Sequence, residues 1–394
     1  MPISKKIETF IASASWIRRM FEEGTRLRAV HGEENVFDFS LGNPTLEPPP
    51  AFQTALVRAA TAPAPGSHRY MPNPGYPDVR AKIAMHLASL HGKPFSASHV
   101  LMTTGAAGAA NCTLKALLDP GDEVLVLAPF FPEYRFYIDN HGGRMVVVET
   151  DEDFDLDVGA VEAAITPRTR AVIVNSPNNP TGRIYEAERL ALLGEVLGTA
   201  QRRHGRSIYL IGDEPYRKIV YGAEVPSLFA AHPNTVVCTS HSKDLGLPGE
   251  RIGYASINPD CSDSGALFDA MAFTNRILGY VNAPALMQRV VADLQDESID
   301  TSIYRHKRDL FLAGLRDAGY EVVEPEGAFY LFPKSPLPDD VAFVHVLARH
   351  LVLAVPGVGF SRGGYFRLAY CVDDQTIERA LPRFREAILE VKGS

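Results

Sequence analysis

Cysteine and long apolar segments are scarce in this sequence of 394 residues. Its four cysteines stand far apart, at Cys112, Cys238, Cys261 and Cys371, so their spacing predicts neither a metal site nor a redox pair. No run of about 18 apolar residues occurs, which argues against a membrane span. The N-terminal segment lacks the unbroken apolar core of a secretory signal. These absences predict reduced thiols and a cytoplasmic location.

An excess of positive charge is also missing. Lys and Arg number 39 against 47 Asp and Glu, which leaves a formal net charge of −8. A protein that binds nucleic acid or an anionic membrane surface needs a positive field, so neither partner is expected. The hydrophobic fraction of 46 % and the charged fraction of 22 % are typical of a globular protein with a large core.

Seven short apolar runs alternate with longer helical patterns from about residue 99 onward. Most of the runs are continuous, such as AVIV and IYLI, which indicates strands buried on both faces. Helices such as 106–118 and 186–204 would cover them. We therefore expect an α/β fold with a mostly parallel seven-stranded sheet. Its strands are expected at residues 99–104, 123–128, 144–149, 170–175, 208–212, 235–240 and 252–257.

The two ends of the chain differ from this middle part. Residues 1–46 carry an amphipathic helix pattern and then a stretch rich in Gly and Pro. The last part begins with a long polar helix at 296–318 and ends with a short strand at 365–369 and a helix at 374–391. We expect a large domain at 47–295, and a smaller α+β lobe made of 1–46 together with 296–394.

The strongest chemical signal is SHSKDLGLPGERIGY, which directly follows a predicted buried strand. Burial at the end of such a strand lowers the pKa of a lysine, here Lys243. A lysine that is partly neutral is a nucleophile suited to attack on a carbonyl. Ser240 and Arg251 flank Lys243, and both side chains can bind phosphate oxygens. The alternative is a solvated surface lysine in a glycine-rich loop.

A second segment, TTGAAGAANC at 103–112, leads from a strand into a helix of small residues. Free backbone amides at the start of that helix, notably those of Ala106 and Ala107, would bind an anion such as phosphate. The alternative is a tightly packed turn. Neither GxGxxG nor GxxxxGK[ST] occurs, so no nucleotide-binding loop is predicted.

Two more segments place polar side chains at the carboxyl ends of predicted strands. NSPNNPTG at 175–182 projects an asparagine amide, although it could be only a turn. IYLIGDEPYRKIVY at 208–221 puts Asp213 at the end of a buried strand. A buried aspartate needs a cationic partner or hydrogen bonds, and the alternative role is a helix N-cap.

Taken together, these segments resemble the fold-type I pyridoxal-phosphate enzymes, specifically the class I and II aminotransferases. The resemblance runs from LGNP at 41–44 to YFRLAY at 365–370. It rests on Ser-x-Ser-Lys-x-x-Gly-x-x-Gly-x-Arg-x-Gly, which follows Asn-Asn-Pro-Thr-Gly and Asp-Glu-Pro-Tyr in order. It implies pyridoxal 5'-phosphate as cofactor, a homodimer, and amino-group transfer between an L-amino acid and a 2-oxo acid. Glutamate and 2-oxoglutarate are the family's usual pair.

The resemblance also assigns roles around the cofactor. Lys243 would carry the cofactor and move the proton of the substrate Cα, and Asp213 would pair with the ring nitrogen. Tyr216 and Asn179 would bond the phenolate oxygen of the ring, and Phe131 would stack on it. The phosphate would be held by Gly105, Ala106, Ala107, Ser240, Ser242 and Arg251, and by Tyr70 of the neighbouring subunit.

For the substrate, the resemblance points to Arg367 as the group that grips the α-carboxylate, helped by the Gly42 backbone and by Asn179. Some relatives specific for aspartate carry a lysine after the glycine of the phosphate turn, where this chain has Ala106 and Ala107. Recognition of a second carboxylate would need another cation. Arg276, in the segment TNRILGYVNAP that faces the partner subunit in the family, is the candidate, with a plain surface arginine as its alternative.

Three other functions remain open from the sequence. A lyase or synthase of the same fold uses the same residues. Ser240 and Lys243 also satisfy the Ser-x-x-Lys pattern of penicillin-recognising acyl enzymes, but the partner motifs Ser-Asp-Asn and Lys-Thr-Gly do not occur. Some transcription regulators contain a related ligand-sensing domain. Only about 40 residues precede LGNP here, which argues against an added DNA-binding module.

Overall fold

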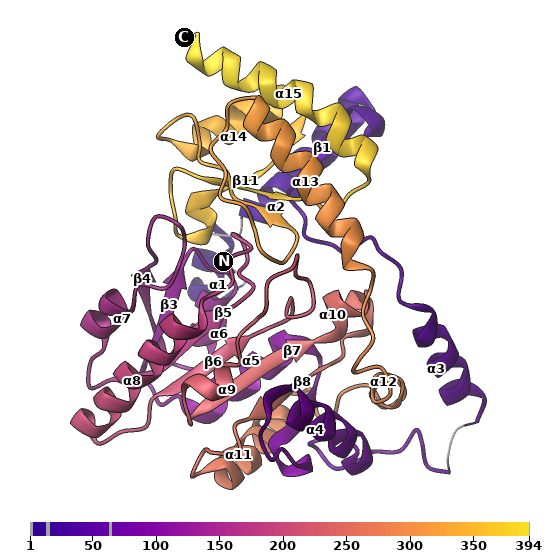
Figure 1. The fold of residues 1–394 in the computed structure, drawn as a ribbon, viewed down its shortest axis with the longest axis vertical. Coiled ribbons are helices and arrows are strands. Elements are labelled where there is room, and N and C mark those ends of the chain that lie inside the picture. The colour runs from indigo at the N-terminus through magenta and orange to yellow at the C-terminus, as the bar shows by residue number, and fades with distance from the viewer. Residues whose placement is uncertain (1–2, 13–15, 63–64, 394) are drawn as a thin grey trace.

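A seven-stranded sheet forms the centre of the larger lobe in the computed structural model, which describes residues 3–12, 16–62 and 65–393 (Figure 1). The strand order is β2-β8-β7-β6-β5-β3-β4, and β8 runs opposite to the other six strands, which point the same way. Every strand begins and ends within one residue of its predicted bounds, so the predicted α/β fold is confirmed. The strands are β2 (Val100–Thr103), β3 (Glu123–Ala128), β4 (Arg144–Glu149), β5 (Thr169–Asn175), β6 (Tyr209–Asp213), β7 (Thr235–Ser240) and β8 (Gly253–Ile257).

Helices cover both faces of this sheet. Leu125 and Leu127 of β3 face a core shared with α4 and α8, whereas Val124 and Val126 face a second core shared with α5 and α11. This division follows from the alternation of side chains along a strand. The helices of this lobe are α3 (Pro50–Thr61), α4 (Pro77–His91), α5 (Gly105–Leu117), α6 (Tyr134–Asn140), α7 (Val158–Ala164), α8 (Ala187–His204), α9 (Leu228–Ala231), α10 (His241–Asp244), α11 (Ser264–Ile277) and α12 (Ala285–Val291).

Strand β4 differs from the prediction of strands buried on both faces. It ends the sheet, and Val148 is its only buried residue, whereas Val147 is 40 % exposed. An edge strand has a neighbour on one side only, so its side chains need not be apolar. The prediction of two buried faces was made for most of the strands, and β4 is an exception, although its position is as predicted.

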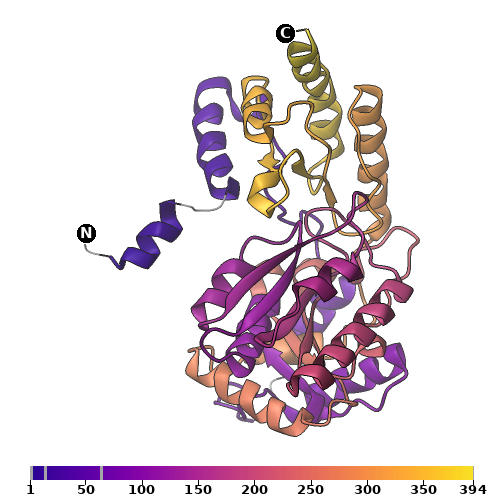
Figure 2. The same cartoon turned by 90° about the vertical axis from the view of Figure 1, so that its left-hand side faces the viewer.

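The smaller lobe combines the two ends of the chain (Figures 1 and 2). Strand β1 (Phe37–Asp38) pairs in parallel with β10 (Val352–Leu353), and β11 (Val355–Pro356), β12 (Phe366–Ala369) and β9 (Tyr330–Leu331) form an antiparallel sheet. Phe39, Phe311 and Phe384 lie together in its core. Its helices are α2 (Trp16–His31), α13 (Thr301–Asp317), α14 (Asp340–Arg349) and α15 (Asp374–Lys392); α1 (Lys5–Ala12) precedes them. Single 3-10 turns are η1 (Glu33–Asn35), η2 (Ala97–His99), η3 (Pro248–Glu250) and η4 (Gly357–Phe360).

Helix α13 begins five residues later than the sequence pattern predicts. The Asp300 carboxylate accepts a hydrogen bond from the Ser302 amide at 2.9 Å and caps the helix there. Upstream, the Ile299 amide donates to the carbonyl of Asp244, which holds the preceding segment against the large lobe. The lobe boundaries at 46/47 and 295/296 stay predictions. Within the described residues, no helix has the length and apolar character that crossing a membrane requires.

Candidate active site

A cavity of about 280 Å³ opens at the carboxyl ends of β5, β6 and β7, beside the small lobe. This is the edge of an α/β sheet at which ligands bind. We call it the active-site cavity. Twelve of the residues predicted from the sequence line it: Gly42, Ala106, Ala107, Phe131, Asn179, Asp213, Tyr216, Ser240, Ser242, Lys243, Arg251 and Arg367.

Lys243 reaches this cavity from α10, the short helix that follows β7. Its Nζ donates a hydrogen bond to the carbonyl of Gly42 at 3.0 Å and lies 5.3 Å from the centre of the Phe329 ring. Burial lowers the pKa of Lys243 to about 8, with nearby arginines adding to the shift. A substantial fraction of this amine is therefore neutral at mildly alkaline pH.

Asp213 ends strand β6 and has one satisfied oxygen and one unsatisfied oxygen. Its Oδ2 accepts a hydrogen bond from the Tyr134 hydroxyl. Its Oδ1 is buried and has no hydrogen-bond partner within the described residues. Burial raises the pKa of Asp213 to about 6, and the Tyr134 hydrogen bond opposes this shift. Such an oxygen is costly to leave unpaired, so the site is suited to a ligand that brings a cationic donor.

Arg367, on strand β12, brings a positive charge from the small lobe. Its Nη1 donates to Asn179 Oδ1 at 3.1 Å and its Nη2 to the Ser40 carbonyl at 2.6 Å, while Nε is buried and has no partner among the described residues. The rings of Tyr330 and Phe360 lie 4.6 and 4.8 Å from the guanidinium carbon. No carboxylate in the described part of the chain pairs with Arg367. The arrangement therefore leaves a buried cation with a free donor, which suits an anionic ligand.

The turn before α5 forms the opposite end of the cavity. Gly105 has a φ of +83°, and a Cβ there would lie 3.0 Å from Arg251 Nη2. The backbone therefore passes close to the guanidinium, and the amides of Ala106 and Ala107 follow at the start of a helix of 13 residues. Together with Ser240, these donors make a cradle for an anion.

Seven residues that line the cavity were missing from the sequence prediction, and Tyr134, Asn175 and Tyr330 are the three whose side chains bond to other residues of the site. Asn175 ends β5, and its side chain bonds both the Asn179 amide and the Asp213 carbonyl at 2.7 Å. The Tyr330 hydroxyl lies 2.9 Å from the Tyr216 hydroxyl. Asn175 could have been found from its place at a strand end. Tyr134 lies in APFFPEY, the segment already noted for Phe131.

Three predicted residues do not line the cavity within this chain: Gly105, which lies in the turn just before Ala106, and also Tyr70 and Arg276. Tyr70 is 93 % exposed. Arg276 lies at the exposed end of α11, with its guanidinium 5.1 Å from the centre of the Phe273 ring. The segments of Tyr70 and Arg276 are adjacent, because the Asn282 side chain donates to the Pro72 carbonyl at 3.0 Å. The roles assigned to both residues in the neighbouring subunit stay predictions.

Known proteins resemble this chain in sequence along most of its length. The family described as "Aminotransferase class I and II" matches residues 34–384. A probable aspartate/prephenate aminotransferase of Thermus aquaticus is 35 % identical over 360 residues, covering 88 % of this chain and 90 % of the relative. An aspartate aminotransferase of Thermotoga maritima is 29 % identical and covers 98 % of this chain and 97 % of the relative.

Solved structures agree with this match. An amino transferase of Eubacterium rectale has 38 % sequence identity and a TM-score of 0.96, over 99 % of both chains. A single mutant of Thermus thermophilus aspartate aminotransferase has 30 % identity and a TM-score of 0.86, over 98 % of this chain and all of that one. The resemblance predicted from the lysine, asparagine and aspartate motifs is thus confirmed, and the chain belongs to the class I and II aminotransferases.

Proposed function

We propose that this transaminase uses pyridoxal 5'-phosphate and moves an amino group between an L-amino acid and a 2-oxo acid. The observation that carries the proposal is the buried, unpaired Oδ1 of Asp213 in the same cavity as the amine of Lys243. A carboxylate in this state is suited to accept a hydrogen bond from a protonated ring nitrogen. A lysine of lowered pKa is suited to attack a carbonyl carbon. Pyridoxal 5'-phosphate has both groups.

The cavity residues fit this cofactor. The phosphate would be held by the amides of Ala106 and Ala107, following Gly105, and by Ser240, Ser242 and Arg251. Asp213 Oδ1 would accept from the ring nitrogen and regain its charge, because a cationic partner lowers the pKa of a carboxyl. The Phe131 ring would stack on the pyridine. When bound, the cofactor supplies an electron sink for the negative charge that develops at the substrate Cα.

The chain's own groups then position and move protons. Lys243 Nζ would hold the cofactor and, once released, would take the proton from the substrate Cα and give it to the cofactor carbon that carries the transferred nitrogen. Its lowered pKa keeps part of the amine free of a proton, as a base requires. Tyr216, supported by the Tyr330 hydroxyl at 2.9 Å, and Asn179 would hold the phenolate oxygen of the cofactor.

Arg367 would bind the substrate α-carboxylate. Its Nε has no hydrogen-bond partner within the described residues and its Nη2 makes one bond, so the guanidinium keeps donors for a substrate carboxylate. The Gly42 backbone and Asn179 lie beside it in the cavity. Both substrates, the amino acid and the 2-oxo acid, would bind their α-carboxylate at this same site.

Glutamate and 2-oxoglutarate are proposed as one substrate pair. Relatives named aspartate aminotransferases support a dicarboxylate, which needs a second cation. Since Ala106 and Ala107 bring none, we assign this part to Arg276 of a neighbouring subunit in a cytoplasmic homodimer. The exposed segments that carry Arg276 and Tyr70 lie side by side, as one partner-facing surface would require.

The cofactor assignment is tested by borohydride reduction of the yellow purified protein followed by peptide mapping. The cofactor should be fixed to the peptide that contains Lys243. Single-turnover reactions with each of the twenty amino acids, followed by absorbance, should show conversion to the aminated cofactor. Loss of a carbon fragment or elimination of a side chain instead would identify a lyase of the same fold. Labelling of another lysine would refute the site.

The distal-carboxylate assignment has its own test. Arg276→Ala should weaken the half-reaction with 2-oxoglutarate by about 2–4 kcal/mol and leave that with alanine unchanged. Arg144→Ala, which removes an exposed arginine from the edge strand, is the matched control and should affect neither. Equal loss with both substrates refutes the role of Arg276. Sedimentation that showed a fully active monomer would refute the shared site.

A further inference from the structure

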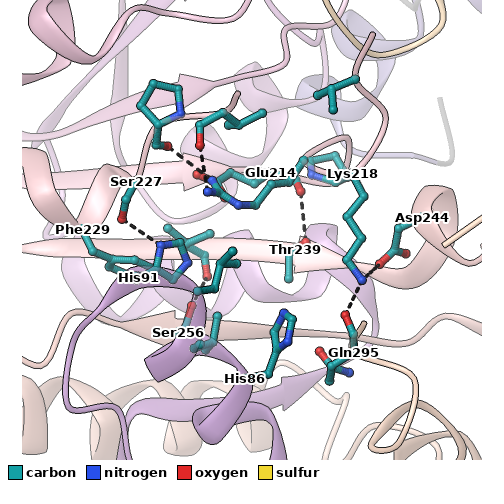
Figure 3. Close-up of a pocket in the computed structure, with 18 of the residues that line it drawn as sticks. His86, His91, Glu214, Lys218, Ser227, Phe229, Thr239, Asp244, Ser256 and Gln295 are labelled. Carbon is teal, nitrogen blue, oxygen red and sulfur yellow. Dashed lines mark hydrogen bonds and ion pairs between the residues drawn. The ribbon is translucent and has the colours of Figure 1, made fainter. Parts of the chain in front are cut away.

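A second and larger cavity, of about 630 Å³, adjoins the active-site cavity at Pro215, and Figure 3 shows residues that line it. We call it the rear cavity. Its walls come from α4, from the segment after β6, from β7 and β8, and from α10. Pro215 is the one residue that lines both cavities. None of the motifs that predicted the active site accounts for this space.

Neighbouring residues of the chain face the two cavities in turn. Asp213 lines the active-site cavity and Glu214 the rear cavity. In α10, Lys243 lines the first, whereas His241 and Asp244 line the second. Only one layer of backbone therefore separates the cofactor lysine from the contents of the rear cavity.

The two cations that line the rear cavity, Arg217 and Lys218, already bond to groups of the protein. Arg217 donates to Glu214 Oε2 at 3.0 Å and to the Val225 carbonyl at 2.9 Å. Lys218 Nζ donates to the carbonyl of Glu297 at 2.9 Å. It also lies 3.8 Å from Asp244 Oδ2, and Figure 3 draws this ion pair as a dashed line. Neither cation is available to an anionic ligand without losing these bonds.

The negative charge of this cavity exceeds its positive charge. Four carboxylates line it, of which Glu214 and Asp244 lie near the two cations. The other two, Glu224 and Asp296, are exposed and have no cation of the cavity beside them to balance their charge. Asp296 is bonded to His86 Nδ1 at 2.9 Å. Burial lowers the pKa of His86, and it lowers that of His91 to about 3, so neither imidazole is charged at neutral pH. The electrostatic field therefore favours a cation.

The remaining wall is apolar and aromatic. Leu87, Leu90 and Phe229 form one side, and the ring of Tyr254 lies 6.0 Å from that of His241. Tyr254 is 7 % exposed, so its ring is largely shielded from water. Aromatic faces attract cations, most strongly where water is excluded.

From this combination we propose that the rear cavity is a second ligand site, which takes a small organic cation with a flat apolar body. The apolar body lies against the leucine and phenylalanine wall, and the cationic head lies toward the aromatic ring of Tyr254 and the excess carboxylates. Through α10, the added positive charge is sensed at Lys243.

The binding test uses benzyltrimethylammonium, a cation that cannot condense with a carbonyl, titrated calorimetrically into the holoenzyme. We expect one site per chain, and at least tenfold weaker binding of phenylacetate, whose shape is similar and whose charge is opposite. Leu90→Trp, at a 49 % exposed position on the cavity wall, should weaken probe binding at least tenfold. Leu192→Trp, at a 50 % exposed position on α8 outside the cavity, is the matched control.

A second pair of variants tests the charge. Glu224→Gln combined with Asp296→Asn should weaken the probe several-fold, whereas Glu152→Gln combined with Asp269→Asn, at exposed positions elsewhere, should not. No binding, equal binding of the anion, or binding unchanged by Leu90→Trp overturns the site. Loss of binding when an amino acid saturates the active site also overturns it, because the probe would then lie in the other cavity.

The link to Lys243 is tested by the pH midpoint of the holoenzyme's visible absorption. A saturating probe should lower this midpoint, because a nearby cation disfavours the protonated form. The shift should vanish in Leu90→Trp and persist in Leu192→Trp. A midpoint that stays constant while calorimetry shows full occupancy overturns the communication through α10.

Discussion

The charged groups on the two walls of the active-site cavity differ in whether they can change protonation near neutral pH. The sheet wall carries Asp213 and Lys243, and the small-lobe wall carries Arg367. On the sheet wall, burial moves the pKa of Lys243 down to about 8 and that of Asp213 up to about 6. On the small-lobe wall, burial also lowers the pKa of Arg367, but an arginine starts so high that it stays charged.

The difference assigns separate tasks to the walls. Of the groups that gain or lose protons, Asp213 lies at the end of β6, where sheet hydrogen bonds hold the backbone on both sides, and Lys243 lies on α10, directly after β7. The group that only holds a charge sits on β12 in the other lobe, and it meets the first wall through Asn179. Proton transfer and substrate binding can therefore be impaired separately, and the following variants test this.

Lys243→Ala should have the largest effect. Losing both the nucleophile and the base should lower turnover by at least about 10⁴-fold, while phosphate and ring contacts keep the cofactor bound. The measurement is turnover together with cofactor content after gel filtration. Loss of the cofactor along with turnover would show that the sheet wall holds it mainly through this lysine.

Asp213→Asn should come next. Without the carboxylate, the ring nitrogen loses its anionic partner, and kcat should fall by about 10²–10³-fold, or about 3–4 kcal/mol. Tyr134→Phe, which removes only the partner of Oδ2, should cost much less. Equal losses in the two variants would contradict the special role of the unpaired Oδ1.

Arg367→Ala tests the opposite wall. We expect KM for both the amino acid and the 2-oxo acid to rise by about 100-fold, with the cofactor spectrum retained. Arg170→Ala removes a part-buried guanidinium that donates to two carbonyls at 3.1 and 2.8 Å outside the cavity, and it should leave KM unchanged. A change confined to kcat would show that Arg367 acts in the chemical step, as Lys243 and Asp213 do, and not in substrate binding.

Gly42→Ala should have a smaller effect through the same wall. A Cβ at Gly42 would lie 2.1 Å from the Tyr330 hydroxyl, so the tyrosine must move and its contact with Tyr216 is disturbed. KM should rise by roughly tenfold. Gly265→Ala, with no atom within 4 Å of the added Cβ, is the control and should be neutral or stabilising. Unchanged kinetics in Gly42→Ala would show that Tyr330 has room to shift.

The smallest expected change is a shift along the pH axis. The rate at which Lys243 of the cofactor-free chain reacts with an amine-directed reagent should rise with pH and level off near pH 8, because the neutral amine is the reactive form. Exposed lysines should continue to gain reactivity toward their ordinary pKa near 10.4. Peptide-resolved labelling measures both. A plateau only near pH 10 would remove the proposed effect of burial.

Much of the fold followed from the sequence because the sheet strands are continuous apolar runs, which few other elements produce. The site residues at strand ends followed as well, since Asp213, Asn179 and Lys243 come directly after such runs. Tyr330 could not be found this way, because it reaches the cavity only through the antiparallel pairing of β9 with β12. The rear cavity was equally hidden, since α4, the segment after β6 and Gln295 approach one another only in the folded chain.

The pairing of β1 with β10 has a consequence for synthesis of the protein. Phe37 lies opposite Val352, which is made 315 residues later (352 − 37). At about 5–20 residues per second, a ribosome needs about 15–60 s to cover that distance. The large lobe can fold late in this interval, once α12 has been made, whereas Phe37 and Phe39 still lack their β10 and α15 neighbours. The nascent N-terminal segment therefore exposes apolar side chains that can aggregate until translation of the small lobe ends.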